Sequence, residues 1–470
     1  MRVMLLICLL ASLAMAPGPA WADGERIVEF GTGGVAVFTP PIYGSEINTF
    51  ANAEKVLVAS DGAILVLVGV TSTDLAHETS QGGYLIRFDA NGMRDWEYGE
   101  PGYAITAVPA FQADEVQRPP SDVQLAPDGA AVLSGTTTYW FMSSEGVFGY
   151  TLIAYVMRYT RTGRRIDSFG YGGIYSTWEE VESKARPIAL RPDGHVLFGG
   201  HFDFQDNRAY VRELRLDGTP DLQFASGGTL ALPPSGPPDN NHSSTAAVAL
   251  QEDGKILVGV REYDWPEGRY GTSVLYRLLP DGVLDAAFGD GGRLNLATLV
   301  GDASLAFEHL RVLSSGHILV GLQRAGVWWN DPGPLLLLDR EGMPVAEFGD
   351  GDGVEDYPVN EWYSFYTLEV DTLGRILVAD TVSAEIARLQ PDGKLDGSFG
   401  QSGIVEFPEL VKVQGLALAP SGAVVLAGQL SSAYVAENDI PEGSVGVIML
   451  SGSAGPDMPL DTLHEGGFEP

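Results

Sequence analysis

The sequence predicts an all-β protein, a seven-bladed β-propeller built from four-stranded antiparallel blades. Three observations predict it. A strand–turn–strand motif recurs seven times with a mean spacing of 60 residues, a second motif alternates with it, and no long helical pattern interrupts the series. Many short strands separated by evenly spaced turns are typical of propellers, in which radial repetition leaves only short sheet edges.

The first motif is a glycine-containing turn between two apolar strands, as in APDGAAVLSG around Gly129 and QEDGKILVG around Gly254. Glycine tolerates positive φ, and a preceding Asp can bond its own backbone, so the motif predicts tight hairpins. The seven turn glycines are Gly62, Gly129, Gly194, Gly254, Gly316, Gly374 and Gly422.

The second motif is LQPDGKLDGSFGQSG at Leu389–Gly403, and it has five sister copies. A further, headless copy stands at Phe30–Val35. With the first motif it gives four strands per period, named a to d. In the sixth unit we expect a at Tyr366–Val370, b at Arg375–Ala379, c at Glu385–Leu389, and d from Gly403.

The two ends of the chain are offset in a way that predicts ring closure. The last unit has strands a, b and c at Gly415–Leu418, Ala423–Gly428 and Val445–Leu450, but no d. Ile27–Phe38 would supply the missing d strand. We therefore expect the N-terminal strand to complete the C-terminal blade and remove the exposed sheet edges.

The pattern PDGxLDxxFGxxG, alternating with QPDGKILVxG, resembles the delta-60 repeat of bacterial exported and surface proteins. The resemblance is greatest at Gln390–Gly403, Leu279–Gly292 and Gln251–Gly259, and it covers nearly the whole chain after the leader. Two copies depart from it: Tyr98 replaces Phe, and Ser314-Ser315-Gly316 replaces Pro-Asp-Gly. The resemblance implies a β-propeller and implies no catalytic residues.

The first 22 residues, Met1–Ala22, read as a secretory signal peptide. Arg2 precedes an apolar run at Met4–Ala16, and Ala20-Trp21-Ala22 is a small-x-small cleavage site. We expect cleavage after Ala22, a propeller over 23–450 and a polar tail over 451–470. Cys8, the only cysteine, lies in the leader, so the mature chain has no thiol chemistry. These features predict a secreted or periplasmic protein.

The chain is strongly acidic, with a net charge of −34. This charge argues against nucleic acid and anionic lipid as partners, and no later stretch is apolar enough for membrane insertion. A protein or carbohydrate at the cell envelope is the partner class that remains.

Loop length distinguishes the two faces of the predicted ring. The a–b and c–d connections lie on one face, here called the turn face, and they are short or stereotyped. The b–c and d–a connections lie on the other, the loop face, and they vary in length. Variable loops on a rigid scaffold usually carry function. The candidate ligand-binding residues on the loop face are Tyr139, Trp140, Asp264, Trp265, Trp328, Trp329, Asp331 and Trp362.

Aromatic rings beside carboxylates suit stacking on sugars or burial in a protein interface. The same rings could instead fill gaps between blades beneath long loops. The leading hypothesis is a non-catalytic binding propeller. The alternative is a metal-assisted glycan lyase, hydrolase or lactonase with its site in the central channel.

Asp350 and Asp352, in the Gly-bent segment Asp350-Gly351-Asp352, form a candidate Ca²⁺ site, although other copies lack these acids. No cofactor is otherwise indicated. The recurring acids Asp167, Asp221, Asp285 and Asp396 are expected to bond turn amides, and the Phe that follows each to pack between blades. His195 and His317 are expected to face solvent.

Overall fold

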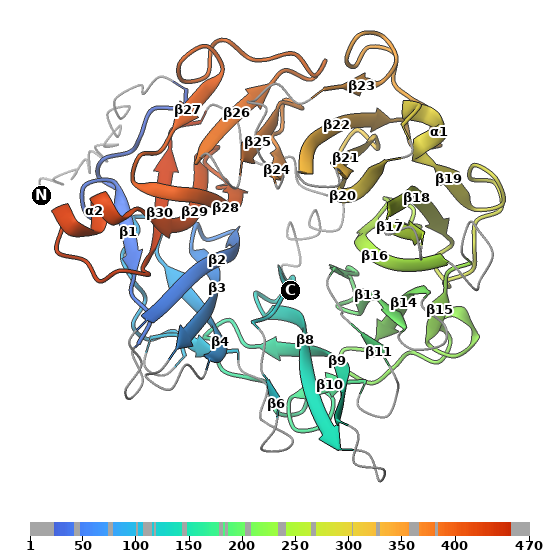
Figure 1. Cartoon of the computed structure of the whole chain (residues 1–470), viewed down its shortest axis with the longest axis horizontal. Coiled ribbons are helices and arrows are strands. Elements are labelled where there is room, and N and C mark those ends of the chain that lie inside the picture. The colour runs from blue at the N-terminus through green and yellow to red at the C-terminus, as the bar shows by residue number, and fades with distance from the viewer. Residues whose placement is uncertain are drawn as a thin grey trace, which may run out of the picture.

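A computed structural model shows seven four-stranded antiparallel blades arranged in a ring (Figure 1). The predicted seven-bladed all-β fold is confirmed. The structure describes residues 23–41, 48–73, 79–99, 102–106, 115–116, 119–142, 148–177, 182–183, 187–202, 208–233, 241–264, 269–302, 304–325, 330–356, 366–380 and 384–452.

Each blade runs outward from the centre of the ring in the order a, b, c, d. Blade 1 contains β2 (Asn48–Val58), β3 (Ile64–Thr73), β4 (Thr79–Phe88) and β5 (Ala104–Ile105). Blade 2 contains β7 (Asp122–Leu125), β8 (Ala131–Met142), β9 (Phe148–Tyr159) and β10 (Ile174–Ser176). Blade 3 contains β12 (Ile188–Leu190), β13 (Val196–Phe202), β14 (Ala209–Leu214) and β15 (Thr229–Ala231).

The remaining blades repeat the same order. Blade 4 contains β16 (Asn241–Leu250), β17 (Ile256–Asp264), β18 (Arg269–Leu278) and β19 (Arg293–Asn295). Blade 5 contains β20 (Leu305–Val312), β21 (Ile318–Ala325), β22 (Asn330–Leu338) and β23 (Val354–Glu355). Blade 6 contains β24 (Tyr366–Val370), β25 (Ile376–Asp380), β26 (Glu385–Leu389) and β27 (Ile404–Glu406).

Blade 7 is built from both ends of the described chain. β28 (Leu410–Leu418), β29 (Val424–Leu430) and β30 (Val445–Leu450) come from the C-terminal end, and β1 (Val35–Phe38) comes from the N-terminal end. β1 pairs antiparallel with β30, with Val35 opposite Ile448 and Phe38 opposite Val445. The dark blue and red strands therefore lie in one sheet (Figure 1).

Several short elements lie outside the four-strand pattern of the blades. β6 (Glu115–Val116) pairs with the end of β8, and β11 (Glu182–Ser183) bridges β9 and β13, so blades 2 and 3 form one continuous sheet. The 3₁₀ turn η1 (Phe224–Ser226) precedes β15, α1 (Leu296–Val300) follows β19, and α2 (Ser432–Glu437) joins β29 to β30. None of the helices in the described ranges has the length and apolar character needed to cross a membrane.

The hydrophobic core lies between the blades rather than at the centre of the ring. The buried side chains group into clusters, each shared by two neighbouring blades, such as one holding Phe348 with Leu319 and Val378. Strands a to c carry apolar side chains on both faces because each sheet is covered by a blade on either side. The core therefore fixes the relative positions of adjacent blades.

The Phe-Gly motif makes the most regular of these contacts. Its aromatic residue is at most 2% exposed in all seven copies: Phe30, Tyr98, Phe169, Phe224, Phe288, Phe348 and Phe399. In each case the ring packs against the c–d turn glycine of the next blade, as Phe348 does against Gly393. A Cβ at that glycine would lie within 3.1 Å of the ring in every blade, which is closer than van der Waals contact. Glycine is therefore needed for this approach as well as for its positive φ. The predicted blade-packing role of the aromatic residue is confirmed.

Candidate functional site

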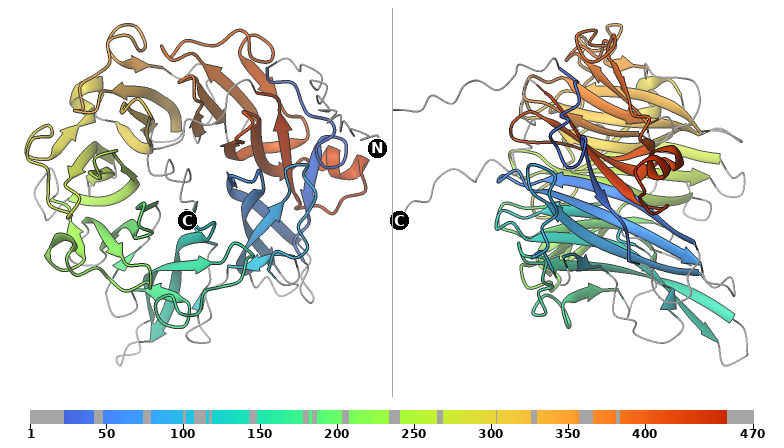
Figure 2. Two further views of the ribbon diagram at one scale, coloured as in Figure 1. Left: turned by 180° about the vertical axis from the view of Figure 1, so that it is seen from behind. Right: turned by 90° about the vertical axis from the view of Figure 1, so that its left-hand side faces the viewer.

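The b–c hairpins on the loop face differ strongly in length between blades. β8 and β9 in blade 2 have 12 residues each, whereas β25 and β26 in blade 6 have five. The a–b turns stay at equivalent positions, so the extra residues extend the hairpin at its loop-face end. The teal hairpin of β8 and β9 reaches out from the body of the ring (Figure 2).

Four of the predicted ligand-binding residues lie at these extended ends. Tyr139 and Trp140 lie near the end of β8, paired with Thr151 and Tyr150. Asp264 ends β17, and Asp331 lies at the start of β22 opposite Arg324. For these four only the backbone is described. Trp265, Trp328, Trp329 and Trp362 lie outside the described residues, so ligand binding by this set stays a prediction.

Charged side chains on or beside the innermost strands join neighbouring blades. The Nζ of Lys55, on β2, lies 2.5 Å from Oδ1 of Asp122 at the start of β7. The other carboxylate oxygen of Asp122 accepts a hydrogen bond from the backbone N of Ile188 in blade 3 at 3.0 Å. One carboxylate thus connects three consecutive blades.

Two further ion pairs repeat this arrangement across the ring. Arg261 of blade 4 lies 2.5 Å from Glu308 of blade 5, and Arg311 of blade 5 lies 3.0 Å from Glu369 of blade 6. Burial alone would lower the pKa of the Arg311 guanidinium, but Glu369 and Asp122 outweigh it and raise that pKa.

β-Bulges add residues to several of the innermost strands. Register shifts leave Glu54 in β2, Ala246 in β16 and Glu308 in β20 as additional residues, and two shifts in β28 leave Val411 and Gln414. A bulge re-aims side chains and is common near functional sites. Burial raises the pKa of the Glu54 carboxyl, and the nearby positive charge of Lys412 opposes that shift.

This set contains four carboxylates (Glu54, Asp122, Glu308 and Glu369) and four cations (Lys55, Arg261, Arg311 and Lys412). In the three ion pairs the acid and the cation belong to different blades, so these contacts can stabilise the ring. It has little surplus negative charge with which to hold a divalent metal ion.

The one described group with metal-ligand spacing lies on the turn face of blade 3. His195, Glu213 and Asp221 have ligand atoms within 4.8 Å of one another. His195 Nδ1 lies 3.0 Å from Glu213 Oε1 and 3.8 Å from Asp221 Oδ2. The prediction that His195 faces solvent was wrong, because its side chain is only 24% exposed and contacts the buried Glu213.

Two arginines already neutralise this group. Arg191 Nε lies 2.8 Å from Glu213 Oε1, and its Nη2 donates to Oε2 at 3.1 Å. Arg215 lies 3.1 Å from Asp221. In blade 4 the matching positions hold Lys255, Arg277 and Asp285. Blade 3 therefore has a carboxylate, Glu213, where blade 4 has a cation, and Arg191 pairs with that carboxylate.

The recurring acids behave as predicted at three of the four positions. Asp221, Asp285 and Asp396 each accept a hydrogen bond from the backbone N two residues later, at 3.1–3.2 Å. Asp167 was wrongly placed in this set. Ile166 holds the equivalent backbone position, and Asp167 is an 80% exposed side chain beside Arg165. Asp95 is the blade 1 member that sequence reasoning missed.

Sequence reasoning also missed the arginine that partners this acid. Arg277 and Arg388, in the c strands, are only 2% exposed and donate to Asp285 and Asp396 eight residues later. The signal was present, because Arg87 and Asp95 have the same spacing in blade 1.

The acids at the candidate Ca²⁺ site are already engaged. Lys394 Nζ lies 2.8 Å from Asp350 Oδ1 and 2.7 Å from Glu355 Oε2. Asp352 accepts a hydrogen bond from the backbone N of Val354 at 3.0 Å. The Lys394 ammonium thus occupies the position where a cation would be attracted, and calcium binding stays a prediction.

The seven-bladed ring of four-stranded sheets puts the chain in the class of β-propellers. A sequence family described as "Domain of unknown function (DUF5122) beta-propeller" matches residues 191–224 and 251–288. These two segments contain the c–d and a–b motifs of blades 3 and 4. No protein with a curated description matches the chain.

Several solved structures are similar at low identity. A protein of unknown function from Dyadobacter fermentans DSM 18053 is 11% identical with a TM-score of 0.40, covering 91% of this chain and 97% of that one. Polysaccharide lyase Uly1 is 10% identical with a TM-score of 0.38, covering 85% and 90%. A glucose dehydrogenase is 12% identical with a TM-score of 0.35, covering 86% and 99%.

Proposed function

We propose that the protein is an exported, non-catalytic β-propeller that binds a protein or glycan at the cell envelope through its loop face. The observation that carries the proposal is the uneven extension of the b–c hairpins, with Tyr139, Trp140, Asp264 and Asp331 at the extended ends. Length variation concentrated on one end of a regular scaffold is the arrangement that binding loops have on other rigid folds.

The pairing of the described carboxylates supports a non-catalytic function. Asp122, Glu308 and Glu369 are paired with cations of neighbouring blades, and Asp285 and Asp396 on the turn face bond turn amides and arginines. Charged groups that are committed to structural bonds are poor general acids or bases. We therefore place ligand binding on the loop face.

Substitution of the loop-face tryptophans tests the proposal. Trp140→Ala, Trp265→Ala and Trp329→Ala should each weaken binding to envelope polysaccharide or peptidoglycan fragments by at least about tenfold, the loss expected for a stacking aromatic. Trp96→Ala is the matched control, because Trp96 is a 68% exposed tryptophan on the turn face. Binding is measured by calorimetry, and folding by thermal melting.

Two outcomes would contradict the proposal. If all three variants unfold, the rings belong to the core. If Trp96→Ala removes binding while the other three retain it, the ligand site lies on the turn face.

The alternative is a metal-assisted glycan lyase, hydrolase or lactonase with its site in the central channel. The described group with metal-ligand spacing, His195, Glu213 and Asp221, lies on the turn face of blade 3 rather than in that channel. Two carboxylates and an imidazole would suit a divalent transition metal. Metal analysis of protein purified without chelator discriminates the two functions. A stoichiometric metal that disappears in the variant His195→Ala would support the enzyme.

A further inference from the structure

The turn face of blade 1 contains a cavity of about 350 Å³, here called the blade 1 hollow. Its lining comes from both the a–b turn and the c–d segment of the blade. The charged residues in this lining are three acids and two arginines: Asp61, Asp89, Asp95, Arg87 and Arg94. The hollow therefore has more acids than cations.

The hollow exists because blade 1 has a small residue where two other blades have an arginine. The residue two positions before the c–d turn glycine is Arg161 in blade 2 and Arg340 in blade 5. The Arg340 guanidinium lies against the a–b turn glycine of its own blade, Gly316. In blade 1 the residue is Ala90, and among the described residues a Cβ added to Gly62 would meet only the Ala90 Cβ within 4 Å. The hollow is therefore the space that an arginine fills in blades 2 and 5.

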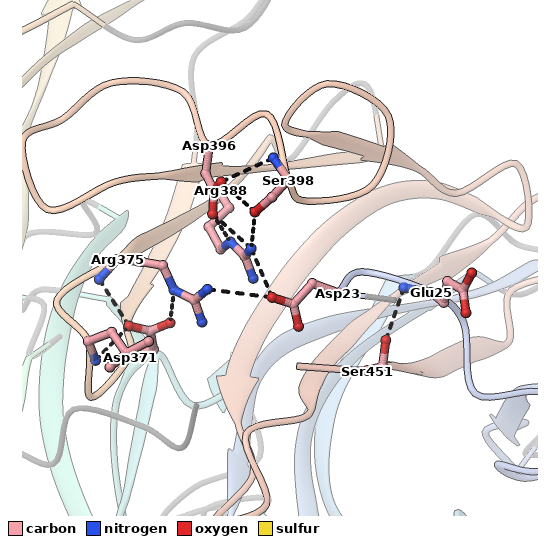
Figure 3. A network of polar contacts seen from close by, with 9 residues as sticks. Asp23, Glu25, Asp371, Arg375, Arg388, Asp396, Ser398 and Ser451 are labelled. Atoms are coloured by element: carbon pink, nitrogen blue, oxygen red, sulfur yellow. Dashed lines mark hydrogen bonds and ion pairs between the residues drawn. The ribbon is translucent and has the colours of Figure 1, made fainter. Parts of the chain in front are cut away.

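The arginine of the c strand has an acid on either side in blade 6 (Figure 3). Arg388 Nη2 lies 2.7 Å from Asp396 Oδ2, in the c–d segment of the same blade. It also lies 3.1 Å from Asp23 Oδ2, in the turn that precedes β1 of blade 7. Both carboxylates are thus held at ion-pair distance by one arginine.

The corresponding arginine of blade 1, Arg87, is paired differently. The acid from the next blade is missing, because Thr162 holds the position that matches Asp23. Arg87 Nη2 lies 2.8 Å from Asp61 Oδ2, whereas its Nη1 lies 3.6 Å from Asp95 Oδ2. Arg87 therefore pairs with Asp61, and Asp95 is less fully neutralised than the corresponding acid of blade 6.

Asp89 and Asp95 each use one carboxylate oxygen to bond the turn. Asp89 Oδ1 accepts hydrogen bonds from the backbone N of Asn91 at 2.9 Å and of Met93 at 2.8 Å. Asp95 Oδ1 accepts one from the backbone N of Glu97 at 3.0 Å. Within the described part of the chain, the Oδ2 atoms of these two acids accept no hydrogen bond. These oxygens can accept hydrogen bonds from a ligand.

The spacing of the acids suits a guanidinium better than a metal ion. Over the described ranges, only the group on blade 3 brings three ligand atoms within 4.8 Å of one another, so the acids of the blade 1 hollow lie farther apart. A guanidinium presents five N–H donors in one plane and can bond two separate carboxylates. The net charge of −34 attracts such a cation from solution.

We propose that the blade 1 hollow binds the arginine side chain of a partner protein. The guanidinium donates to Oδ2 of Asp89 and of Asp95, and its aliphatic stem lies along Met93, which also lines the hollow and is 61% exposed. The bound side chain takes the place that Arg161 and Arg340 hold in their own blades. This site is separate from the loop face, so it gives the propeller a second binding surface.

Two blocked tripeptides test the proposal. One is glycine–arginine–glycine, and the other has citrulline, which has nearly the same shape and no charge, in place of arginine. Calorimetry is carried out at about 0.15 M salt, which screens attraction between exposed charges beyond about 8 Å. We expect the arginine peptide to bind at least about tenfold more tightly, because its hydrogen bonds to the carboxylates are charge-assisted.

Three variants locate the site. Ala90→Arg should weaken binding of the arginine peptide about tenfold, because its own guanidinium fills the hollow, and it should fold because blades 2 and 5 have arginine at this position. Asp95→Asn keeps an oxygen for the Glu97 amide, loses the charge and should also weaken binding. Met343→Arg is the matched control, because it adds the same charge in blade 5 at the exposed turn position that matches Met93. It should change the affinity by at most about twofold.

Two results would overturn the proposal. One is equal binding of the arginine and citrulline peptides. The other is a loss of affinity in Met343→Arg as large as that in Ala90→Arg, which would mean that the peptide is attracted to the acidic chain as a whole. Thermal melting of each variant shows that a loss of binding comes from the site and not from unfolding.

Discussion

The Nε of Arg277 donates a hydrogen bond to Oδ2 of Asp285 at 2.8 Å, and the guanidinium lies 4.5 Å from the centroid of the Phe288 ring. Blade 6 repeats this geometry, with Arg388 bonded to Asp396 at 2.8 Å and 4.6 Å from Phe399. Arg277 also donates to the backbone O of Arg340 and to the side chain of Glu341 in blade 5. The arginine therefore ties its own c–d turn to the next blade.

Removal of the acid in this unit should be costly. Asp285→Ala leaves Arg277, only 2% exposed, without one of its charge partners, and we expect a loss of about 3 kcal/mol of unfolding free energy. Asp167→Ala is the matched control, because Asp167 is an exposed acid in the corresponding motif of blade 2 and should cost at most about 0.5 kcal/mol. Denaturant unfolding measures both, and equal losses would contradict the structural role.

Acid should destabilise the propeller through these same groups. Burial would raise the pKa of the Asp285 carboxyl, but the hydrogen bond from Ala287 and the charge of Arg277 outweigh it and hold the pKa below the usual 3.8. Asp396 has a lowered pKa too, because Ser398 and Arg388 outweigh burial.

The folded state therefore binds these protons less tightly than the unfolded state. The stabilisation is complete above the unfolded pKa near 3.8 and is lost as the pH falls through the lower folded pKa. We expect melting midpoints to be insensitive to these groups near neutrality and to fall below about pH 4. A double variant with Asp285→Asn and Asp396→Asn should be less stable at pH 7, and its melting midpoint should fall less steeply as the pH drops below about 4. A fall as steep as that of the unaltered protein would mean that other carboxylates cause the acid destabilisation.

The carboxylate of Asp122 should matter for the centre of the ring. Asp122→Ala removes the partner of Lys55 and of the Ile188 amide together, so we expect a loss of about 2 kcal/mol. Asp122→Asn keeps an oxygen acceptor for the amide and should cost less. Hydrogen exchange at Ile188 distinguishes the variants, with fast exchange expected only in Asp122→Ala.

The calcium prediction at Asp350 and Asp352 can be tested through Lys394. The Lys394 ammonium bridges Asp350 and Glu355. We therefore expect that calcium raises the melting temperature of the intact protein no more than it raises that of Asp350→Asn. Lys394→Ala frees both carboxylates and should be the form in which any calcium effect appears. A calcium-stabilised wild type that becomes insensitive in Asp350→Asn would establish the site.

Much of the fold could be predicted because residues close together in the sequence define each repeat. Turn glycines, alternating apolar residues and the Phe-Gly motif each specify a strand or a turn within a few residues, and β24 and β26 have the bounds expected of them. The candidate site was less accessible. The pairing of Lys55 with Asp122, or of Arg261 with Glu308, depends on which blades are neighbours and on the bulges in the inner strands, and neither follows from local pattern.

The sequence by itself determined the number of blades, the strand order within each blade and the aromatic residue that seals each interface, because those features depend on residues close together in the chain. Only the tertiary structure decided that Asp23 lies against Arg388 and that Asp167 stands outside the motif it seemed to join. It also decided that Glu213 of blade 3 is neutralised by Arg191. These facts depend on the ring, which brings groups hundreds of residues apart within hydrogen-bonding distance and makes each charge depend on the blade beside it.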